Sequence, residues 1–332
     1  MTIDIPGEVA LAGFAVGLGF GALARWSGFC LRGAVEDVLT KPDAPRARGF
    51  LLAIVVALAS VQALVLTGQL DLSKAVVLPT SLFWGGALLG GLLFGVGMVL
   101  TGGCGTRMLV LAGGGNLRSV VVFVVFGFVA YATIRGILAP MRATLMAASS
   151  VTLTQQTLPL VAGGIVLALA VTFILWRPLS TQQLIGGALI GALVPAGYLV
   201  TAVLGHDDFN PTAVESINVT RGGGDSLIYL LTWTGSKINF GIAFVAGVLI
   251  GAALVALLRR EFRLEGFERP ADMLRYALGG ALMGVGGVLA LGCTVGNGLT
   301  GIASLAPTSF IALPAMVLAA AATLKWRWRT KA

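Results

Sequence analysis

The chain has 332 residues, of which 57% are hydrophobic and only 11% are charged. Together with a mean hydropathy of +0.95, this composition excludes an ordinary soluble globular protein and predicts an all-α polytopic membrane protein. The formal net charge of +8 is explained by membrane topology and by attraction to anionic lipid of the inner leaflet, so nucleic-acid binding is not needed to account for it.

Apolar stretches close to the roughly 20 residues needed to cross a bilayer predict about nine transmembrane helices. In chain order they cover residues 8–26, 49–68, 81–101, 118–139, 157–176, 182–203, 238–258, 272–291 and 306–324. The first span has acidic flanks at Asp4 and Glu8 and no basic segment before it. We therefore expect it to stay in the mature protein rather than be cleaved as a signal peptide.

The distribution of lysine and arginine predicts the orientation, because cytoplasmic loops and span ends carry the excess of these residues. With the N-terminus outside and the C-terminus in the cytoplasm, most basic residues fall on the inner side, chiefly in the loop 259–275 and in the tail after Lys325. The outer side then holds only Lys74, Arg135, Arg142, Arg221 and Lys237. The expected protein is multi-pass, with its two termini on opposite sides of the membrane.

An internal duplication ends on two of the cysteines. Residues 90–104, GGLLFGVGMVLTGGC, and residues 279–293, GGALMGVGGVLALGC, share most of their sequence, and a weaker copy, VGLGFGALARWSGFC, ends at Cys30. A fourth copy at 185–200, IGGALIGALVPAGYLV, has Val200 in the position of the thiol. Because the third and eighth spans run in opposite directions, we expect a single domain, 1–332, made of inverted repeats at about 8–139 and 182–324, related by a pseudo-two-fold axis.

The segments that follow the three cysteines are too glycine-rich for spanning helices and too apolar for surface loops. Irregular backbone at membrane depth is tolerated only inside protein or beside a wet cavity, so these segments predict re-entrant loops with short half-helices. Unpaired backbone N–H groups and the N-termini of half-helices at such breaks are suited to bind an anion.

All three cysteines occupy equivalent positions of a repeat, which favours a functional role over packing as small hydrophobes. Their odd number argues against a disulfide framework. A neutral thiol is a weak donor with a soft sulfur, suited to a ligand with exposed sulfur or to a soft metal. The only histidine, His206, stands in a polar loop beside Asp207 and Asp208, where it is expected to be solvated. We therefore predict no bound metal and no other cofactor.

Three arginines close to the thiols speak against a cation path. Arg107 follows Cys104 by three residues, and Arg25 and Arg32 flank Cys30. Arginines inside a membrane are costly and usually face a cavity or a partner, although a long side chain near a helix end also extends to the interface. Both readings stay open for Arg107, and the second is favoured for Arg25.

Three isolated cysteines, each ending a glycine-rich helix, with GGC-GTR at Cys104 and GC-TVGNGLTG at Cys293, resemble the YeeE/YedE family of bacterial inner-membrane sulfur transporters, whose studied members take up thiosulfate. The resemblance runs from about Gly17 to the ninth span. It implies nine spanning helices with extra short ones, an hourglass of inverted halves, and cysteines spaced along the solute path. It maps the central thiol onto Cys104 and the other two onto Cys30 and Cys293.

The mechanism implied is import of thiosulfate, or a closely related sulfur anion, without enzymatic chemistry. Thiosulfate is a dianion with a terminal soft sulfur, so backbone N–H groups would hold its oxygens while successive thiols hydrogen-bond its sulfur. The predicted substrate path consists of Cys30, Cys104, Cys293, Gly103, Gly105, Arg107, Gly292, Thr294 and Asn297. Gly103 and Gly292 are expected to be needed for close backbone approach or for a positive φ. Thr294, Asn297 and Asn116 are either polar contacts or local caps.

Other functions remain open alternatives. In a membrane sulfurtransferase, Cys104 would form a persulfide with its thiolate stabilised by Arg107. A soft-metal transporter would use the thiols as ligands, and sulfite, selenium analogues and small organic sulfur compounds are other candidate solutes. The resemblance also implies a small sulfur-carrier protein as a possible partner. The chain stops soon after its last span, so we expect no fused carrier domain, and a separate cytosolic one would dock on the basic loop 259–275.

Overall fold

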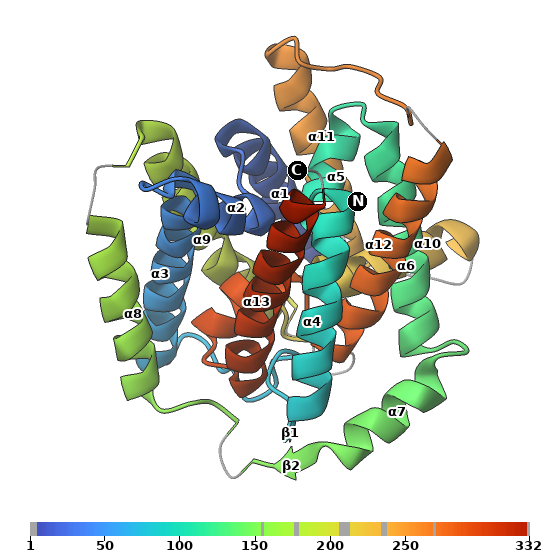
Figure 1. Cartoon of the computed structure of the whole chain (residues 1–332). Helices are drawn as coiled ribbons and strands as arrows, with labels where there is room; N and C mark the ends of the chain where they lie inside the picture. Colours follow the sequence, from blue (N-terminus) through green and yellow to red (C-terminus); the bar gives the residue numbers. More distant parts are fainter. Residues whose placement is uncertain are drawn as a thin grey trace.

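The computed structural model describes residues 5–153, 156–175, 179–205, 213–233, 238–267 and 270–330. These residues fold almost entirely into helices (Figure 1), and seven of the described helical segments are long and apolar enough to cross a membrane. The prediction of an all-α polytopic membrane protein is confirmed. His206, Asp207 and Asp208, predicted to form a solvated loop, lie outside the described residues.

Each predicted span coincides with a helix of the structure. These helices are α1 (Ile5–Ser27), α3 (Pro45–Leu66), α4 (Trp84–Thr101), α6 (Leu117–Ile134), α8 (Leu160–Leu175), α9 (Thr181–Leu199), α11 (Phe240–Leu258), α12 (Pro270–Leu289) and α13 (Pro307–Arg329). Two of them, α8 and α12, are not among the seven. Helix α8 has only 16 residues, and α12 carries Asp272 and Arg275 in its first turns. The count of nine spans therefore stays a prediction.

Short helices follow all three cysteines, as the glycine-rich segments predict. They are α2 (Leu31–Thr40), α5 (Gly105–Gly113) and the π-helix η3 (Gly296–Gly301). Three further elements were not expected from the sequence: the helices α7 (Ala139–Ala148) and α10 (Val219–Leu231), and a two-stranded sheet. The π-helix η1 (Val200–Leu204) continues α9 and lies almost wholly within the span predicted at 182–203.

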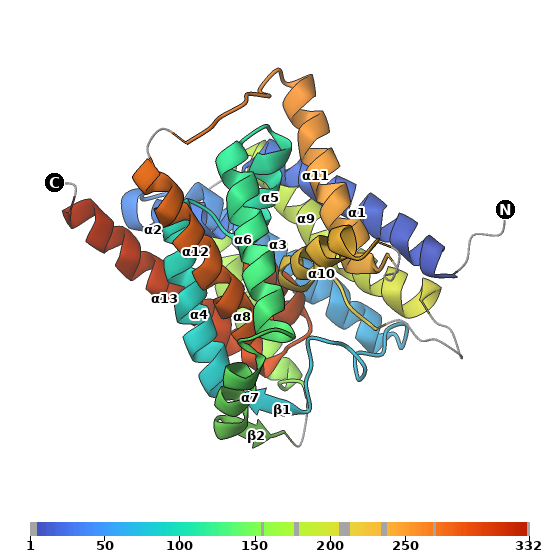
Figure 2. The same ribbon diagram turned by 90° about the vertical axis from the view of Figure 1, so that its right-hand side faces the viewer.

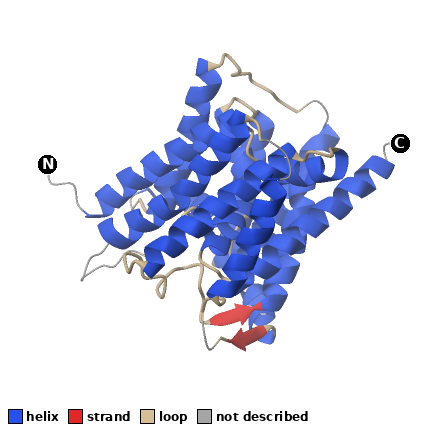
Figure 3. Cartoon of the chain, turned by 90° about the vertical axis from the view of Figure 1, so that its left-hand side faces the viewer, coloured by secondary structure: helices blue, strands red, loops and turns tan. Residues whose placement is uncertain are grey.

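The sheet changes the bounds of one predicted span. Strand β1 (Ser81–Phe83) pairs antiparallel with β2 (Ser150–Thr152), with Leu82 opposite Val151, and Figure 3 shows the pair at the edge of the helical body. Helix α4 consequently begins at Trp84 instead of residue 81. The span predicted at 118–139 is also shorter, because the chain turns after Ile134 and α7 begins at Ala139.

Glycines allow the helices to pack backbone to backbone. Helices α4 and α12 are antiparallel neighbours: a methyl group on Gly90 would lie 2.6 Å from the carbonyl oxygen of Gly286, and one on Gly97 would lie 2.6 Å from that of Gly279. Such distances leave no room for a side chain, and small residues at helix interfaces of membrane proteins provide this close approach.

Four more helix pairs pack in the same way, and all four are parallel. They are α1 with α11, α3 with α9, α4 with α13, and α6 with α12. A methyl group on Gly187 of α9 would meet the Gly49 carbonyl oxygen of α3 at 2.6 Å, and one on Gly91 of α4 would meet the Ala312 carbonyl oxygen of α13 at 2.6 Å. In Figure 1, α4, α12 and α13 run through the middle of the molecule, with α3, α8 and α9 to the left.

The loop after α11, at the top of Figure 2, is fastened to the turn between α5 and α6. The backbone N–H groups of Arg263 and Glu265 donate to the carbonyl oxygens of Gly114 and Gly115, at 3.2 Å each, and Leu117 N–H donates to the carbonyl oxygen of Glu265 at 2.9 Å. The loop thus extends the turn by main-chain hydrogen bonds, and its position is fixed relative to α5.

Candidate functional site

The three cysteines have the same backbone surroundings. A residue with positive φ lies two positions before each of them: Gly28 (φ 68°), Gly102 (φ 86°) and Leu291 (φ 59°). Each such residue ends one helix. The cysteine then begins the next, because its carbonyl oxygen accepts a hydrogen bond of 2.8–2.9 Å from the N–H group four residues later. The sequence repeat therefore corresponds to a repeated structural unit.

The fourth copy of the repeat lacks this break. Val200, which replaces the cysteine, has helical dihedral angles, φ −58° and ψ −49°, and α9 runs on into η1. The positive-φ residues also differ from expectation. At the two matched copies they are Gly102 and Leu291, one position before Gly103 and Gly292. Glycine at 103 and 292 is thus not needed for a positive φ.

Two of the thiols line one small enclosed space, here called the thiol cavity. It has a volume of about 10 Å³ and is lined by Phe20, Ala24, Phe29, Cys30, Leu31, Phe50, Cys104, Thr106, Arg107, Val110, Thr294 and Val295. This volume holds about one water molecule. Cys104 is buried and Cys30 is half-buried, and both thiols are free. The conformation described is therefore closed around the cavity.

Cys293 lies next to the thiol cavity and is connected to it through Thr106. The Thr106 hydroxyl is 3.8 Å from the Cys293 sulfur, within the range of a weak hydrogen bond, and the sulfur accepts from the backbone N–H of Gly296 at 3.4 Å. The structure thus brings Cys30, Cys104 and Cys293 to one region.

Two polar groups at the cavity have no hydrogen-bond partner in the described structure. They are Arg107 Nη1 and Thr294 Oγ1, a hydroxyl on a side chain with no exposed surface, which lies beside the Cys104 thiol without a hydrogen bond of normal geometry. A buried polar group without a partner costs about 1–3 kcal/mol. Both side chains line the cavity, so a polar solute there would supply the missing hydrogen bonds.

Two predicted glycines leave room for neighbouring side chains. A methyl group on Gly103 would lie 2.8 Å from Cγ of Arg107 and 2.8 Å from Cε of Met108, and one on Gly105 would lie 3.1 Å from the Phe126 ring. Gly103 therefore determines where Arg107 can lie.

The side chain of Asn297 forms three hydrogen bonds with other groups of the protein. Its Nδ2 donates to the carbonyl oxygens of Ala290 (3.1 Å) and Gly292 (2.7 Å), and its Oδ1 accepts from the Ser309 hydroxyl at 2.9 Å. A methyl group on Gly292 would approach Asn297 Nδ2 to 3.1 Å. These bonds fix the turn before Cys293, so Asn297 positions the thiol through the backbone.

The remaining predicted polar residues do not line the thiol cavity and have partners elsewhere in the described structure. Asn116 caps α6 by accepting from Ser119 N–H at 3.0 Å, and its Nδ2 donates to Glu265 at 2.6 Å. Arg25 forms an ion pair of 3.3 Å with Glu261 in the loop after α11. Arg32 pairs with Glu36 at 3.2 Å within α2.

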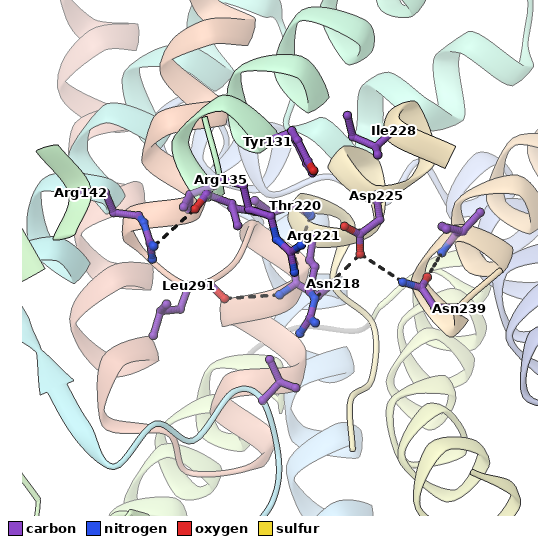
Figure 4. Close-up of a pocket in the computed structure, with 15 residues that line it drawn as sticks. Tyr131, Arg135, Arg142, Asn218, Thr220, Arg221, Asp225, Ile228, Asn239 and Leu291 are labelled. Carbon is purple, nitrogen blue, oxygen red and sulfur yellow. Dashed lines mark hydrogen bonds and ion pairs between the residues drawn. The ribbon is translucent and has the colours of Figure 1, made fainter. Parts of the chain in front are cut away.

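A much larger pocket, here called the vestibule, opens near Cys293 (Figure 4). Its volume is about 590 Å³, and its polar lining comes from Tyr131, Arg135, Arg142, Asn218, Thr220, Arg221, Asp225 and Asn239. Three arginines face a single carboxylate, so the lining carries net positive charge. The three come from different elements: the end of α6, α7 and α10. An anion is attracted into such a pocket.

The vestibule reaches the turn that holds Cys293. Asn218 Nδ2 donates to the carbonyl oxygen of Leu291 at 3.3 Å, and Thr220 Oγ1 is buried without a partner. The backbone N–H of Gly296 donates to the Cys293 sulfur. A methyl group on Gly296 would lie 3.1 Å from Asn218 Oδ1. Asn218 and Thr220 were missed in the sequence. The signal that would have found them is Asn-Val-Thr-Arg-Gly-Gly-Gly, where an asparagine cap precedes a glycine run.

The fold and the buried thiols define a polytopic membrane protein with an interior site. The family model described as sulphur transport matches residues 26–185 and again residues 179–322. The chain therefore belongs to the sulphur transport family, the YeeE/YedE family.

Two curated relatives match over most of their length. The chain is 27% identical over 322 residues to "Thiosulfate transporter TsuA" of Spirochaeta thermophila, covering 90% of this chain and 93% of the relative. It is 30% identical over 345 residues to "Thiosulfate transporter TsuA" of Escherichia coli, covering 94% of this chain and 92% of the relative.

Proposed function

We propose that this protein imports thiosulfate, or a closely related sulfur anion, across the bacterial inner membrane. The observation that carries the proposal is the meeting of three equivalent thiols with two unpartnered buried polar groups, Thr294 Oγ1 and Arg107 Nη1. The names of the two relatives support the choice of solute. With the N-terminus outside, the vestibule faces the outer side, where it collects the anion.

The thiols then act as a relay without covalent change. An anion leaving the vestibule passes the Leu291 turn, meets Cys293, and reaches Cys104 and Cys30 through Thr106. At each step an S–H group donates a weak hydrogen bond to the terminal sulfur of the anion. Sites that bind weakly and in series let an ion enter and also leave. Opening of the thiol cavity is required, because its present volume of about 10 Å³ is too small for the anion.

The rings of Phe20, Phe29 and Phe50 suit this relay. Phe29 stacks on Phe50 with ring centroids 4.9 Å apart and meets Phe20 edge-on at 6.5 Å. Sulfur makes favourable contacts with aromatic rings. An apolar wall therefore receives the soft sulfur end, while Thr294 and Arg107 are placed to bind the oxygens.

We also propose that the two halves are inverted repeats. Exchanging α1 with α9, α3 with α11, α4 with α12 and α6 with α13 turns the α1–α11 pair into α9–α3 and the α6–α12 pair into α13–α4. The four pairs α1–α11, α9–α3, α6–α12 and α13–α4 are all in contact, and the two helices of each pair are parallel. The antiparallel pair α4–α12 maps onto itself, which supports an axis beside Gly90 and Gly286.

The test is growth on thiosulfate as sole sulfur source in a bacterium deficient in thiosulfate uptake. The chain should restore growth, and its Cys104→Ala variant, at matched protein level in the membrane, should not. Equal growth with both proteins would refute the relay. A mass gain of one sulfur on Cys104 after exposure to thiosulfate would instead identify a sulfurtransferase, the second candidate. In that reaction the Cys104 thiolate, stabilised by Arg107, attacks the terminal sulfur of thiosulfate, the S–S bond of thiosulfate breaks, and sulfite leaves.

A further inference from the structure

The vestibule arginine Arg221 is shared between two carboxylates. Its Nη1 lies 3.9 Å from Glu215 Oε2, and its Nε lies 3.9 Å from Asp225 Oδ2. Neither pair is a close hydrogen-bonded contact, and the arginine side chain is 46% exposed. An anion in the vestibule therefore competes with both carboxylates for this guanidinium.

The two carboxylates differ in their surroundings. Asp225 lines the vestibule and accepts a hydrogen bond of 3.1 Å from Asn239, so its charge has a second partner (Figure 4). The side chain of Glu215 is only 17% exposed, against 29% for Asp225. The Thr201 hydroxyl bonds both backbone polar groups of Glu215. It accepts from Glu215 N–H at 3.1 Å and donates to the Glu215 carbonyl oxygen at 2.7 Å.

Charged and titratable groups near Glu215 come from three directions. Arg221 and Asp225 come from α10, and Tyr198, whose hydroxyl bonds Ser304 at 2.7 Å, comes from α9. The loop that bridges to Val214 carries Asp71, which accepts from Ser73, and Lys74. Burial raises the pKa of Glu215 to about 6; Arg221 opposes the rise and Asp225 adds to it. The carboxyl group therefore takes up a proton at a higher pH than an exposed glutamate does.

We propose that Glu215 is a proton-binding positioning residue, which releases Arg221 to the anion when its carboxyl group is protonated, so that one proton and one sulfur anion bind together. The proton moves from the outer solution to a carboxylate oxygen of Glu215, and no covalent bond of the anion changes. This inference rests on the proposed function, since it assigns a coupled proton to the same transport path.

The sign of the coupling follows from charge. With Glu215 ionised, two carboxylates oppose the charge of Arg221, which binds the anion weakly; with Glu215 neutral, only Asp225 opposes it and the guanidinium binds the anion more strongly. Coupling between two ligands is reciprocal, so a bound anion also raises the proton affinity of Glu215. Anion affinity should thus rise as the pH falls through about 6 and level off below it.

The experiment is calorimetric titration of the purified full-length protein with sodium thiosulfate from about pH 5 to about pH 8, in two buffers that differ in heat of ionisation. The Kd of the wild type should rise roughly tenfold over this range, a typical size for coupling between sites. The difference in heat between the buffers should report proton uptake on binding, and this second measurement needs no variant.

Two substitutions separate the roles of the carboxylates. At every pH, Glu215→Gln should bind thiosulfate with the affinity that the wild type shows at low pH. It should take up no proton on binding. Asp225→Asn should raise the affinity and keep a dependence on pH, with the change shifted to lower pH because Asp225 no longer raises the pKa of Glu215. The same pH dependence in Glu215→Gln as in the wild type, or a flat profile in the wild type, would overturn the inference. A wild type that binds no thiosulfate at any pH would overturn the proposed function itself.

Discussion

The vestibule and the thiol cavity lie on one proposed path but differ in size and chemistry. The vestibule has about 590 Å³, is open, and presents three arginines; the thiol cavity has about 10 Å³, is enclosed, and presents two thiols among aromatic rings. Charge acts over a distance, whereas a weak S–H hydrogen bond acts only in contact. The comparison teaches that the proposed path assigns attraction of the anion and recognition of its sulfur to separate residues.

The largest expected effect concerns the thiol cavity. Cys104→Ser should lower the rate of thiosulfate uptake by roughly 10- to 100-fold, because hydrogen bonds to charged groups contribute about 1.5–3 kcal/mol and a hydroxyl is a poor partner for soft sulfur. Cys30→Ser and Cys293→Ser should give intermediate rates. Uptake of labelled thiosulfate into cells with matched protein levels measures this order. Equal rates for all three variants would contradict the prediction that Cys104 contributes most to transport.

An intermediate effect is expected in the vestibule. Arg135→Gln should raise the thiosulfate concentration for half-maximal uptake by roughly threefold to tenfold and leave the maximal rate nearly unchanged. The substitution weakens attraction of the anion into the vestibule but does not alter the thiols along the path. Added salt should reduce the difference from wild type, since it screens exposed charges.

The matched control for Arg135 is Arg329→Gln, an exposed arginine at the end of α13, which should leave the half-maximal concentration unchanged. If Arg135→Gln instead lowered the maximal rate at unchanged half-saturation, the vestibule and the cavity would not be separable.

The smallest effect, and the most discriminating, is expected at Thr294. Thr294→Val keeps the shape but removes a buried hydroxyl without a partner, so thermal stability in detergent should rise by about 1 kcal/mol. Uptake should fall roughly threefold, because the hydroxyl is then unavailable to the anion. Stability that drops together with uptake would show that Thr294 has a structural partner instead.

Hydropathy was enough to locate the nine long helices among the described residues. The sequence repeat was enough to predict that the three cysteines occupy equivalent positions. The break before Cys293 could not be placed correctly, because Leu291 adopts a positive φ that leucine rarely takes and the neighbouring Gly292 is the residue to which sequence reasoning assigns it. The expected short helices after Cys30, Cys104 and Cys293 are present, since glycine-rich apolar sequence fits little else at this depth.

The vestibule could not be predicted, for a physical reason. Arg135, Arg142 and Arg221 come from segments outside the repeated helices, and they meet only because α6 ends at Ile134 and turns into α7 while α10 packs against α6. The sheet that alters the start of α4 joins residues about 70 positions apart in sequence, as in Leu82 and Val151, and such long-range pairing leaves no local signal.

The fastening of the loop after α11 has a mechanical consequence for the central thiol. Helix α5 begins directly after Cys104 and has nine residues, a length of about 13 Å, and its far end is joined to that loop by the hydrogen bonds of Gly114 and Gly115. A rigid helix transmits displacement from one end to the other. We therefore expect a displacement of this loop to be passed along α5 toward Cys104.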